Sequence, residues 1–498
     1  MPATQKFLAF DLGAESGRAV LGHFDGATLK LEDVHRFPNG GVRCGETLYW
    51  DTFRLWGELK NACAIAARQG HGDLAAIGVD TWGGGFGLLD KDGELIGPPV
   101  CYRDARNAPA MAAALRKLPR KTIYASTGLQ FMQFNTLYQL YALARRKSPQ
   151  LANAATFLMM PDLFNFWFTG RKACEYTIAS TTQFLNARKK TWDTALLKKL
   201  GIPTRMLPKI VQPGTVLGRL RKSVQADTGL GPVQVVASGC HDTASAVAAV
   251  PARGRDHVYI SSGTWSLMGA ELDEPLINDM TAGYNFTNEG GVCGTIRFLK
   301  NIMGLSLVPE CRRAWERAGE KLDYTEIRAL AGQAKPLVSI VEPDHHEFLA
   351  PPDMPGAIQD FCKRTGQPVP QDKGAIARCA FESLALKYRW TLERIEECRG
   401  QKVSVIHIVG GGAQNTLLNQ LAADATGRAV VTGPIEATAI GNILRQAIAR
   451  KAVGPLDQAR GGVRNSFPVT TYEPSKDRAA WDDAYGRYLE ASKAAKAF

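Results

Sequence analysis

The sequence predicts an α/β protein made of two large domains, and three observations lead to this prediction. The chain has 498 residues, about three times the length of a typical domain. Apolar runs with strand character alternate with helical runs along its whole length. Its two halves also open alike: "FLAFDLGAESGRAVLG" and "HVYISSGTWSLMGAE" each show an apolar strand, a turn of glycine and hydroxyl residues, and a returning apolar strand.

The turn glycines of these two hairpins, Gly13 and Gly263, are half a chain length apart, as expected for a duplicated domain. We therefore expect an N-terminal domain over residues 1–248 and a C-terminal domain over residues 249–498. Apolar runs predict strands, and one-sided apolar spacing followed by Gly400 predicts a long helix over about residues 374–398. The strands are expected at residues 7–13, 75–80, 233–239, 258–262, 403–409 and 428–432.

Composition excludes several classes of protein. The net charge is +12, but the basic clusters at residues 116–121, 145–147 and 188–190 are not interleaved with aromatic residues, so nucleic-acid binding is not expected. A positive field does help to gather phosphorylated ligands. No apolar span approaches the roughly 18 residues that a membrane helix needs, and Asp11 interrupts the first apolar run, so neither a membrane segment nor a signal peptide is expected.

The ten cysteines form no Cys-x-x-Cys pair, which disfavours a zinc site and favours reduced thiols in a cytoplasmic protein. Whether Cys362 and Cys379 pair is left open. We expect a monomer or a small homo-oligomer.

The two hairpin turns, "DLGAESGR" and "SSGTWS", are candidate phosphate sites. Glycine allows close approach of a phosphate to backbone N–H groups, and hydroxyl side chains add donors. A single turn of this kind is weak evidence, but two at equivalent places could hold a polyphosphate from both sides. Asp11 ends the first strand, where it either caps the turn or faces Mg²⁺ through water.

Two further glycine clusters carry candidate ligand contacts. In "VDTWGGGFGLLD", Trp82 could form an apolar platform for a sugar and Gly83 could offer backbone groups, although a tight turn with a core tryptophan fits equally well. In "IVGGGAQNTLLNQL", the run from Gly410 to Gly412 joins a strand to a helix and presents N–H donors to a nucleotide. Asn415 breaks the G-x-G-x-x-G spacing, and no Gly-Lys dipeptide exists for a P-loop.

The stretch "GCHDTASAVA" places a carboxylate, Asp242, between a strand and a helix of small residues. Phosphoryl transfer to a hydroxyl needs a base near the accepting oxygen, and Asp242 is the candidate, with the helix N-terminus favouring its ionised form. An ordinary aspartate N-cap fits this stretch equally well. The "DHHE" run at residues 344–347 lacks the spacing of a helical metal site and is expected in a surface loop.

Nine stretches together resemble the FGGY family of carbohydrate kinases, in order and over about residues 7–445. They are "FDLGAESGR", "GVDTWG", "YRDAR", "FNTLYQL", "CHDTASAV", "SSGTWSLMG", "TNEGG", "LKNIMGL" and "HIVGGGAQNTLLNQL". The resemblance implies two actin-like (ribonuclease H-like) domains with a central catalytic cleft. It also implies transfer of the γ-phosphate of ATP, with Mg²⁺, to the 1-hydroxyl of a ketose, L-rhamnulose in the branch whose motifs match best.

Residue by residue, the resemblance implies that Asp242 is the proton acceptor. His241, Thr243, Gly83 and Asn301 would contact the sugar. Spacing alone would also allow His241 to relay a proton, but the resemblance favours a hydroxyl ligand. The residues assigned by it to the nucleotide are Ala14, Glu15, Ser16, Gly17, Arg18, Thr264 and Gly411, with Gly410 and Gly412 beside it.

Three departures from the family pattern concern the finer detail. Glu15 stands where relatives commonly have Ser or Thr, Gly85 where they often have Asp, and Pro309 where a polar nucleotide contact is expected. Kinases for L-fuculose or L-xylulose therefore stay as alternatives. An actin-like ATPase is disfavoured because it needs no base in a sugar pocket, and a non-catalytic sugar sensor is disfavoured by the intact phosphate turns and Asp242.

Overall fold

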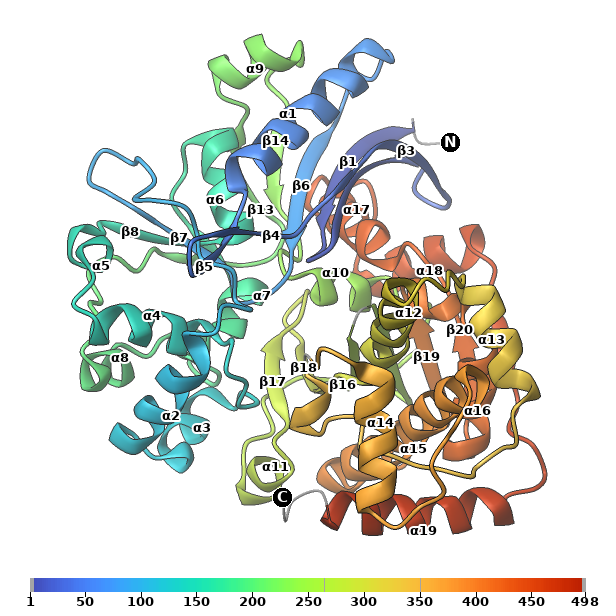
Figure 1. Ribbon diagram of the computed structural model, residues 1–498. Helices are drawn as coiled ribbons and strands as arrows, with labels where there is room; N and C mark the ends of the chain where they lie inside the picture. Colours follow the sequence, from blue (N-terminus) through green and yellow to red (C-terminus); the bar gives the residue numbers. More distant parts are fainter. Residues whose placement is uncertain (1–3, 264, 350, 495–498) are drawn as a thin grey trace. The chain divides into compact units, whose positions relative to one another are not determined.

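The computed structural model describes residues 4–263, 265–349 and 351–494, which form two compact units (Figure 1). Unit 1 comprises the chain up to Pro251, Glu271–Phe298 and Glu436–Phe467. Unit 2 takes Ala252–Ala270, Leu299–Ile435 and the chain from Pro468 onward. Each unit is thus assembled from separate segments, whereas the sequence argument divides the chain once, between residues 248 and 249. That boundary stays a prediction.

Unit 1 is built on a mixed six-stranded sheet of order β13-β14-β6-β1-β2-β3. Strand β1 pairs antiparallel with β2 and parallel with β6, and β6 in turn pairs parallel with β14. The first predicted hairpin is therefore confirmed as β1–β2. The strands are β1 (Gln5–Leu12), β2 (Ser16–Phe24), β3 (Leu29–Pro38), β6 (Ala76–Thr81), β13 (Thr215–Arg219) and β14 (Gln234–Ala237).

The two faces of this sheet carry different chemistry. One face is apolar: Leu8 and Phe10 of β1 join a core with Leu55 and Leu59 of α1 (Thr52–Arg68) and with side chains of α6 (Met160–Thr169). The opposite face is covered by α17 (Ala437–Ala449), which contacts β1, β2 and β6 and lies across the sheet from α1 in Figure 1. Polar side chains gather on this second face, as described below.

The remaining elements of unit 1 surround the sheet. Short strands and helices fill residues 41–211, and four helices of the described chain, α9, α10, α11 and α18, lie outside that range. They are β4 (Gly41–Cys44), β5 (Thr47–Trp50), β7 (Phe86–Leu89), α2 (Asn107–Lys117), α3 (Arg120–Thr127), α4 (Thr136–Arg145), α5 (Pro149–Asn153), β8 (Thr156–Met159), β9 (Cys174–Glu175), α7 (Tyr176–Ala179), β10 (Leu185–Asn186), β11 (Thr191–Trp192), α8 (Thr194–Leu200), β12 (Ile210–Val211), α9 (Lys222–Thr228), α10 (Asp242–Ala248), α11 (Asp279–Gly283) and α18 (Leu456–Ser466).

The second sheet repeats the plan of the first. Its seven strands follow the order β17-β18-β16-β15-β19-β20-β21. Strand β15 pairs antiparallel with β16 and parallel with β19, β19 pairs parallel with β20, and β20 pairs antiparallel with β21. This sequence of pairings matches that of β1 with β2, β6, β14 and β13, so the duplication predicted from the two hairpins is present in the topology. The strands are β15 (His257–Ser262), β16 (Ser266–Leu272), β17 (Thr287–Gly290), β18 (Ile296–Ile302), β19 (Val405–Val409), β20 (Ala429–Thr432) and β21 (Thr470–Tyr472).

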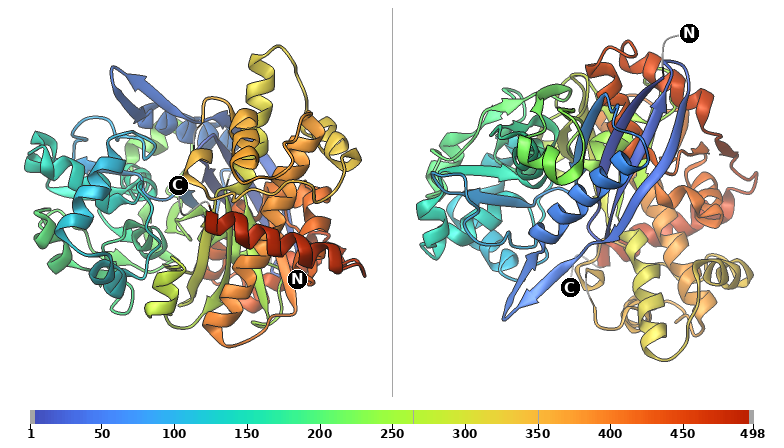
Figure 2. Two further views of the ribbon diagram at one scale, coloured as in Figure 1. Left: turned by 60° about the horizontal axis from the view of Figure 1, so that its bottom comes forward. Right: turned by 90° about the horizontal axis from the view of Figure 1, so that it is seen from above.

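The long helix predicted at about residues 374–398 is α15 (Lys373–Arg399), and it ends at Gly400 in the left-handed conformation, as expected for a glycine stop. The C-terminal helix α19 (Ala479–Ala494), red in Figure 2, packs against α15 and α16. The other helices of unit 2 are α12 (Leu307–Arg317), α13 (Tyr324–Gln333), α14 (Met354–Arg364) and α16 (Thr416–Thr426), and short 3₁₀ turns lie at Gly304–Ser306, His346–Phe348 and Gly411–Gln414.

Two further sequence expectations bear on the class of protein. In the part of the chain that the structure describes, no helix is both long enough and apolar enough to cross a membrane. All ten cysteines are free, including Cys362 and Cys379, which lie close enough to influence each other's pKa.

Candidate active site

Three carboxylates lie at the carboxyl ends of three neighbouring parallel strands in unit 1. Asp11 lies near the end of β1, Asp80 near the end of β6, and Asp242 follows β14 through the loop 238–241. The register places Asp11 opposite Asp80 across the β1–β6 pair. Because this edge of a parallel sheet gathers the loops that follow its strands, it is where ligands of open α/β sheets usually bind.

Asp11 is held by Arg18, its partner across the β1–β2 hairpin. Nε and Nη2 of Arg18 donate to Oδ2 of Asp11 at 2.9 and 2.6 Å, and Nη1 of the same guanidinium pairs with Glu436, the residue before α17. Asp11 is buried. The hairpin therefore presents an oriented carboxylate together with a cation at the edge of the sheet.

Asp80 is a buried carboxyl group to which the sequence argument gave no role. Nδ2 of Asn442, on α17, donates to its Oδ2 at 2.6 Å, and Oδ1 has no hydrogen-bond partner among the described residues. Burial, together with the nearby charge of Asp11, raises the pKa of Asp80 well above its usual range. Burial thus disfavours the ionised form of Asp80 more than that of the partly exposed Asp242. The sequence signal that could have identified Asp80 is that an aspartate lies at or just after the end of each of three predicted strands.

Asp242 is the first residue of α10, as predicted, but His241 and not Asp242 is the N-cap. Oδ1 of Asp242 accepts hydrogen bonds from the backbone N–H and the hydroxyl of Thr243, and its side chain is 30% exposed. The sequence argument expected the helix N-terminus to favour the ionised form. Burial acts in the other direction and raises the pKa of Asp242, with His241 opposing part of the rise.

The small residues after Asp242 are explained by the contact of α10 with α17. A Cβ placed on Gly441 of α17 would lie 1.7 Å from the carbonyl oxygen of Ser245, so the two backbones touch at a point where no side chain fits. The hydroxyl of Ser245 donates to the carbonyl of Gly239 and ties the helix to the loop before it. Close packing of two helices therefore fixes the position of Asp242.

A buried glutamate that the sequence argument did not single out holds the loop before Asp242. Glu175 accepts hydrogen bonds from the N–H groups of Thr177, Ile178 and Cys240 and from the hydroxyl of Thr177. That hydroxyl in turn accepts the N–H of His241 at 3.1 Å. The backbone immediately before the candidate base is thus anchored to a fully buried carboxyl group.

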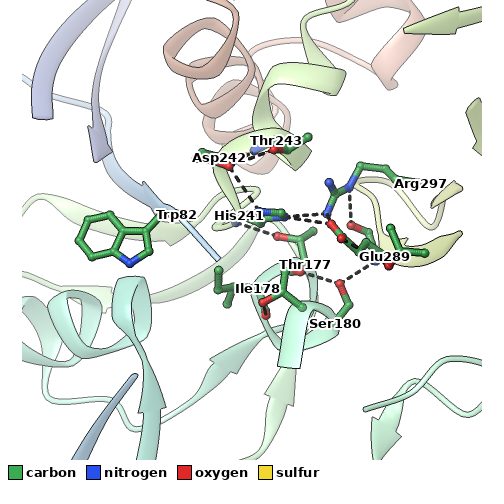
Figure 3. Close-up of polar contacts among 12 residues, drawn as sticks. Trp82, Thr177, Ile178, Ser180, His241, Asp242, Thr243, Glu289 and Arg297 are labelled. Atoms are coloured by element: carbon green, nitrogen blue, oxygen red, sulfur yellow. Dashed lines mark hydrogen bonds and ion pairs between the residues drawn. The ribbon is translucent and has the colours of Figure 1, made fainter. Parts of the chain in front are cut away.

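His241 lies between Asp242 and a buried ion pair (Figure 3). Its Nε2 is 3.4 Å from Oδ1 of Asp242, and its Nδ1 is 3.0 Å from Nη2 of Arg297 and 3.3 Å from Oε2 of Glu289. Arg297 is fully buried. Although burial opposes ionisation of Glu289, the charge of Arg297 and the contact with His241 lower its pKa overall. Glu289 stands in the "TNEGG" motif, but nothing in its spacing indicated a contact with His241.

The glycine run after β6 lies beside His241. A Cβ on Gly83 would lie 3.3 Å from Nε2 of His241, whereas one on Gly85 would lie 2.8 Å from Nε1 of Trp82. Trp82 is buried with its ring centroid 4.1 Å from that of Trp50, so packing accounts for its position, and the contact of its ring with a sugar stays a prediction. Gly85 departs from the family pattern because a side chain there would have to displace Trp82.

The first phosphate turn is the tip of the β1–β2 hairpin. The Asn39 side-chain amide donates to the carbonyl of Gly13, and its backbone N–H donates to the carbonyl of Glu15. A Cβ on Gly17 would lie 2.3 Å from the Phe37 ring, so only glycine fits there. The Glu15 side chain is about half exposed, with Oε1 3.9 Å from Arg103. The turn residues predicted to contact the nucleotide, from Ala14 to Arg18, are therefore continuous at the end of one hairpin.

Unit 2 holds the other candidate nucleotide residues. The glycine run after β19 packs on the end of β15: a Cβ on Gly412 would lie 1.9 Å from the hydroxyl oxygen of Ser262, and one on Gly410 would lie 2.9 Å from its carbonyl oxygen. Gly411 has nothing within 4 Å of such an atom.

Three other residues singled out in the sequence belong to unit 2. Asn301, a sugar candidate, lies on β18. Pro309 lies in the first turn of α12, where proline is tolerated. Thr264 falls outside the described residues.

Among the described residues, no group of three or more His, Cys, Asp or Glu side chains is arranged to hold a metal ion. Mg²⁺ does not require such a group, because it is commonly bound through one or two carboxylates, several waters and the phosphates of a substrate. Asp11, fixed by Arg18 through one of its oxygens, fits a contact of that kind.

Sequence comparison finds one protein family whose two domain models together cover most of the chain. Residues 6–249 match the N-terminal domain of the FGGY family of carbohydrate kinases, and residues 258–450 match its C-terminal domain. The chain is 45% identical to a rhamnulokinase from Bacteroides thetaiotaomicron (97% of this chain, 98% of the relative) and 43% identical to one from Pectobacterium atrosepticum (95% and 94%).

Solved structures show the same fold at low identity. A xylulose kinase from Lactobacillus acidophilus matches with a TM-score of 0.84 at 18% identity, over 99% of both chains. A glycerol kinase from Plasmodium falciparum matches with a TM-score of 0.80 at 14% identity, also over 99% of both chains.

Proposed function

The chain belongs to the FGGY family of carbohydrate kinases, and from that premise we propose that it transfers the γ-phosphate of ATP to the 1-hydroxyl of L-rhamnulose. The products are L-rhamnulose 1-phosphate and ADP. The observation that carries this choice of sugar is the likeness to curated rhamnulokinases at 39–45% identity over nearly the full chain. We place the reaction in the cytoplasm.

Asp242 is the proposed base. Its contacts with Thr243 and His241 all use Oδ1, so we assign Oδ2 to the sugar hydroxyl. In the reaction the hydroxyl proton moves to Asp242, the sugar oxygen forms a bond to the γ-phosphorus, and the bond from that phosphorus to the β–γ bridging oxygen breaks to release ADP. A raised pKa suits this role, because a base whose pKa lies closer to the working pH takes a proton more effectively.

The other residues are assigned to binding. His241, Thr243, Gly83, Trp82 and Asn301 contact the sugar. In phosphoryl transfer most of the catalytic effect comes from positioning and charge neutralisation, which we assign to the N–H groups of the turn at residues 14–18, the Arg18 guanidinium, Thr264 and the run from Gly410 to Gly412.

Mg²⁺ bound to the ATP phosphates would neutralise their charge, and Asp11 would hold it through water. Asp11 has the required orientation because Arg18 fixes its carboxylate. Asp11 and Asp242 thus have separate proposed tasks at the three-carboxylate edge. We expect EDTA to abolish turnover and added Mg²⁺ to restore it.

Kinases for L-fuculose or L-xylulose, and an actin-like ATPase, were the alternatives from the sequence. The curated relatives do not favour them, since those reported above are rhamnulokinases. The xylulose kinases among the solved structures are 17–19% identical and share the fold alone.

The decisive experiment measures ADP release by the purified protein with Mg-ATP and a panel of ketoses: L-rhamnulose, L-fuculose, L-xylulose and D-xylulose. We expect kcat/KM to be highest for L-rhamnulose, with the phosphate on its 1-oxygen by NMR. A higher value for another ketose would overturn the choice of sugar. ADP release at the same rate without sugar would overturn the kinase assignment itself.

A further inference from the structure

The imidazole of His241 is held from behind by two charged groups at short range. Nη2 of Arg297 lies 3.0 Å from Nδ1 of His241 and 3.1 Å from Oε2 of Glu289, and Oε2 lies 3.3 Å from Nδ1. The three atoms form a compact triangle, seen to the right of the imidazole in Figure 3. Both charged side chains are buried, Arg297 completely.

The hydrogen-bond donors of Arg297 indicate which nitrogen of the His241 ring carries a hydrogen. A guanidinium carries donors only, and its Nη2 has two hydrogens. One of them reaches Nδ1, and Nε donates to the carbonyl of Gly290 at 2.9 Å, whereas Oε2 of Glu289 forms an ion pair with Nη2 at 3.1 Å and has no hydrogen-bond partner among the described residues. If Nδ1 itself carried a hydrogen, two N–H groups would face each other across 3.0 Å. Nδ1 is therefore the acceptor, and a neutral imidazole then carries its hydrogen on Nε2.

The Nε2 side of the ring lies toward Asp242 and Gly83, where we assign the sugar. Nε2 is 3.4 Å from Oδ1 of Asp242, and a Cβ on Gly83 would be in tight contact with Nε2 at 3.3 Å, so only glycine leaves this side of the ring uncovered. A hydrogen on Nε2 can therefore be donated to an oxygen placed between Gly83 and Asp242.

We infer that Arg297 is a positioning residue that holds His241 as the Nε2–H tautomer, so that His241 donates a hydrogen bond to an oxygen of the ketose. Glu289 balances the buried charge of Arg297 and does not set the tautomer. This rests on the proposed function and deepens it: the pocket selects a sugar that offers a hydrogen-bond acceptor at this point and disfavours a deoxy analogue.

The first test reads the tautomer directly, without substrate. ¹⁵N NMR of histidine-labelled full-length protein, with His241→Asn to assign the signals, should show Nδ1 of His241 unprotonated and Nε2 protonated. Glu289→Gln should leave this pattern unchanged, because Arg297 still donates to Nδ1. Arg297→Met should move the hydrogen to Nδ1, where Glu289 accepts it. A protonated Nδ1 in the wild type, or a change of tautomer in Glu289→Gln, would overturn the inference even if Arg297→Met does not fold.

The second test separates positioning from a structural role. In Arg297→Met we expect the KM for L-rhamnulose to rise about tenfold, as for loss of one hydrogen bond, with the KM for ATP within about twofold of wild type. Glu271→Gln is the matched control, because Glu271 pairs with another buried arginine, Arg460, at 2.8 Å. It should lower stability and leave the sugar KM unchanged.

Equal increases in the two KM values for Arg297→Met would contradict the positioning role. Arg297→Met should also add no further rise in sugar KM to a His241→Ala background, and an additive effect would contradict it as well. A wild-type protein that phosphorylates none of the ketoses would refute the proposed function, whereas the tautomer measurement would still stand or fall by itself.

Discussion

At the scale of single residues, the active-site edge of unit 1 is arranged by unequal burial of similar groups. Asp11, Asp80 and Asp242 lie at the ends of three adjacent parallel strands, and full burial raises the pKa of Asp80 well above its usual range. Asp11 has an arginine partner, and Asp242 keeps a partly exposed side chain. The three carboxyl groups therefore have different environments, which is consistent with the separate tasks proposed for Asp11 and Asp242.

Asp242→Asn tests the base. The amide keeps the shape of the side chain but cannot take a proton, so we expect kcat to fall by about 10²–10⁴-fold, with little change in the binding of ATP or sugar. Rapid-quench measurement of ADP and calorimetric titration check the two statements. Asp372→Asn, which changes an aspartate that caps α15, is the control and should retain full turnover. More than about a tenth of wild-type kcat in Asp242→Asn would place the base elsewhere.

Glu175 provides a pH-dependent prediction. Burial raises the pKa of its carboxyl group to about 7 in the folded protein. A group whose pKa is raised on folding stabilises the folded protein at low pH. This stabilisation is lost as the pH rises through the pKa of the group in the folded state. The free energy of unfolding of the wild type, relative to Glu175→Gln, should therefore fall by up to about 3 kcal/mol between pH 4.5 and pH 7.5. Urea unfolding at several pH values measures it, and a difference independent of pH would refute the shift.

At the scale of elements, the contact of α10 with α17 explains a sequence feature that local rules leave open. The run "TASAVA" after Asp242 looks like an ordinary helix face of small residues. Its partner is Gly441, which lies 196 positions after Ser245 in the chain, and the carbonyl of Ser245 occupies the place of the Gly441 Cβ. Neither stretch alone predicts the other, because the contact is formed by the backbones of the two helices and not by a recognisable pair of side chains.

Gly441→Ala should separate the two helices. The added methyl group has no room, so we expect a loss of about 1–3 kcal/mol in the free energy of unfolding and a lower kcat, since Asp242 begins the displaced helix. Gly57→Ala is the matched control: Gly57 lies inside α1, is exposed and has nothing near its Cβ position. That change should stabilise the protein by about 0.5–1 kcal/mol. Wild-type stability and kcat in Gly441→Ala would contradict the close packing.

At the scale of the whole molecule, the chain builds the same sheet plan twice and gives the copies different side chains. In the unit 1 sheet, the ends of the parallel strands carry Asp11, Asp80 and Asp242, and His241 lies beside Asp242. In the copy built around β15 and β19, the strand ends carry glycine turns packed on Ser262. We therefore expect the reacting hydroxyl of the sugar to depend on the Asp242 edge of unit 1 and the nucleoside to depend on the glycine run of unit 2.

Gly411→Val tests this division. The position has open space around its Cβ and no left-handed backbone, so the fold should tolerate valine, which would fill the space that we assign to the nucleoside. L-rhamnulose at about 100 times its Kd should raise the free energy of unfolding by about 2.7 kcal/mol in both wild type and variant. The stabilisation by ATP should be lost in the variant alone. Equal stabilisation by ATP in both proteins would remove Gly411 from the nucleotide site.

The sequence by itself determined the fold class, the duplicated hairpins, the long helix and the family, because hydrophobic period, glycine turns and motif order are local signals. It also pointed to Asp242, which stands at a strand–helix junction, although its role as base stays a prediction. Only the tertiary structure decided that burial raises the pKa of Asp80, that Glu175 and Arg297 hold the loop and ring beside Asp242, and that Gly441 sets the position of α10. Those effects depend on burial and on contacts between residues far apart in the chain, and neither burial nor distance is written in a local pattern.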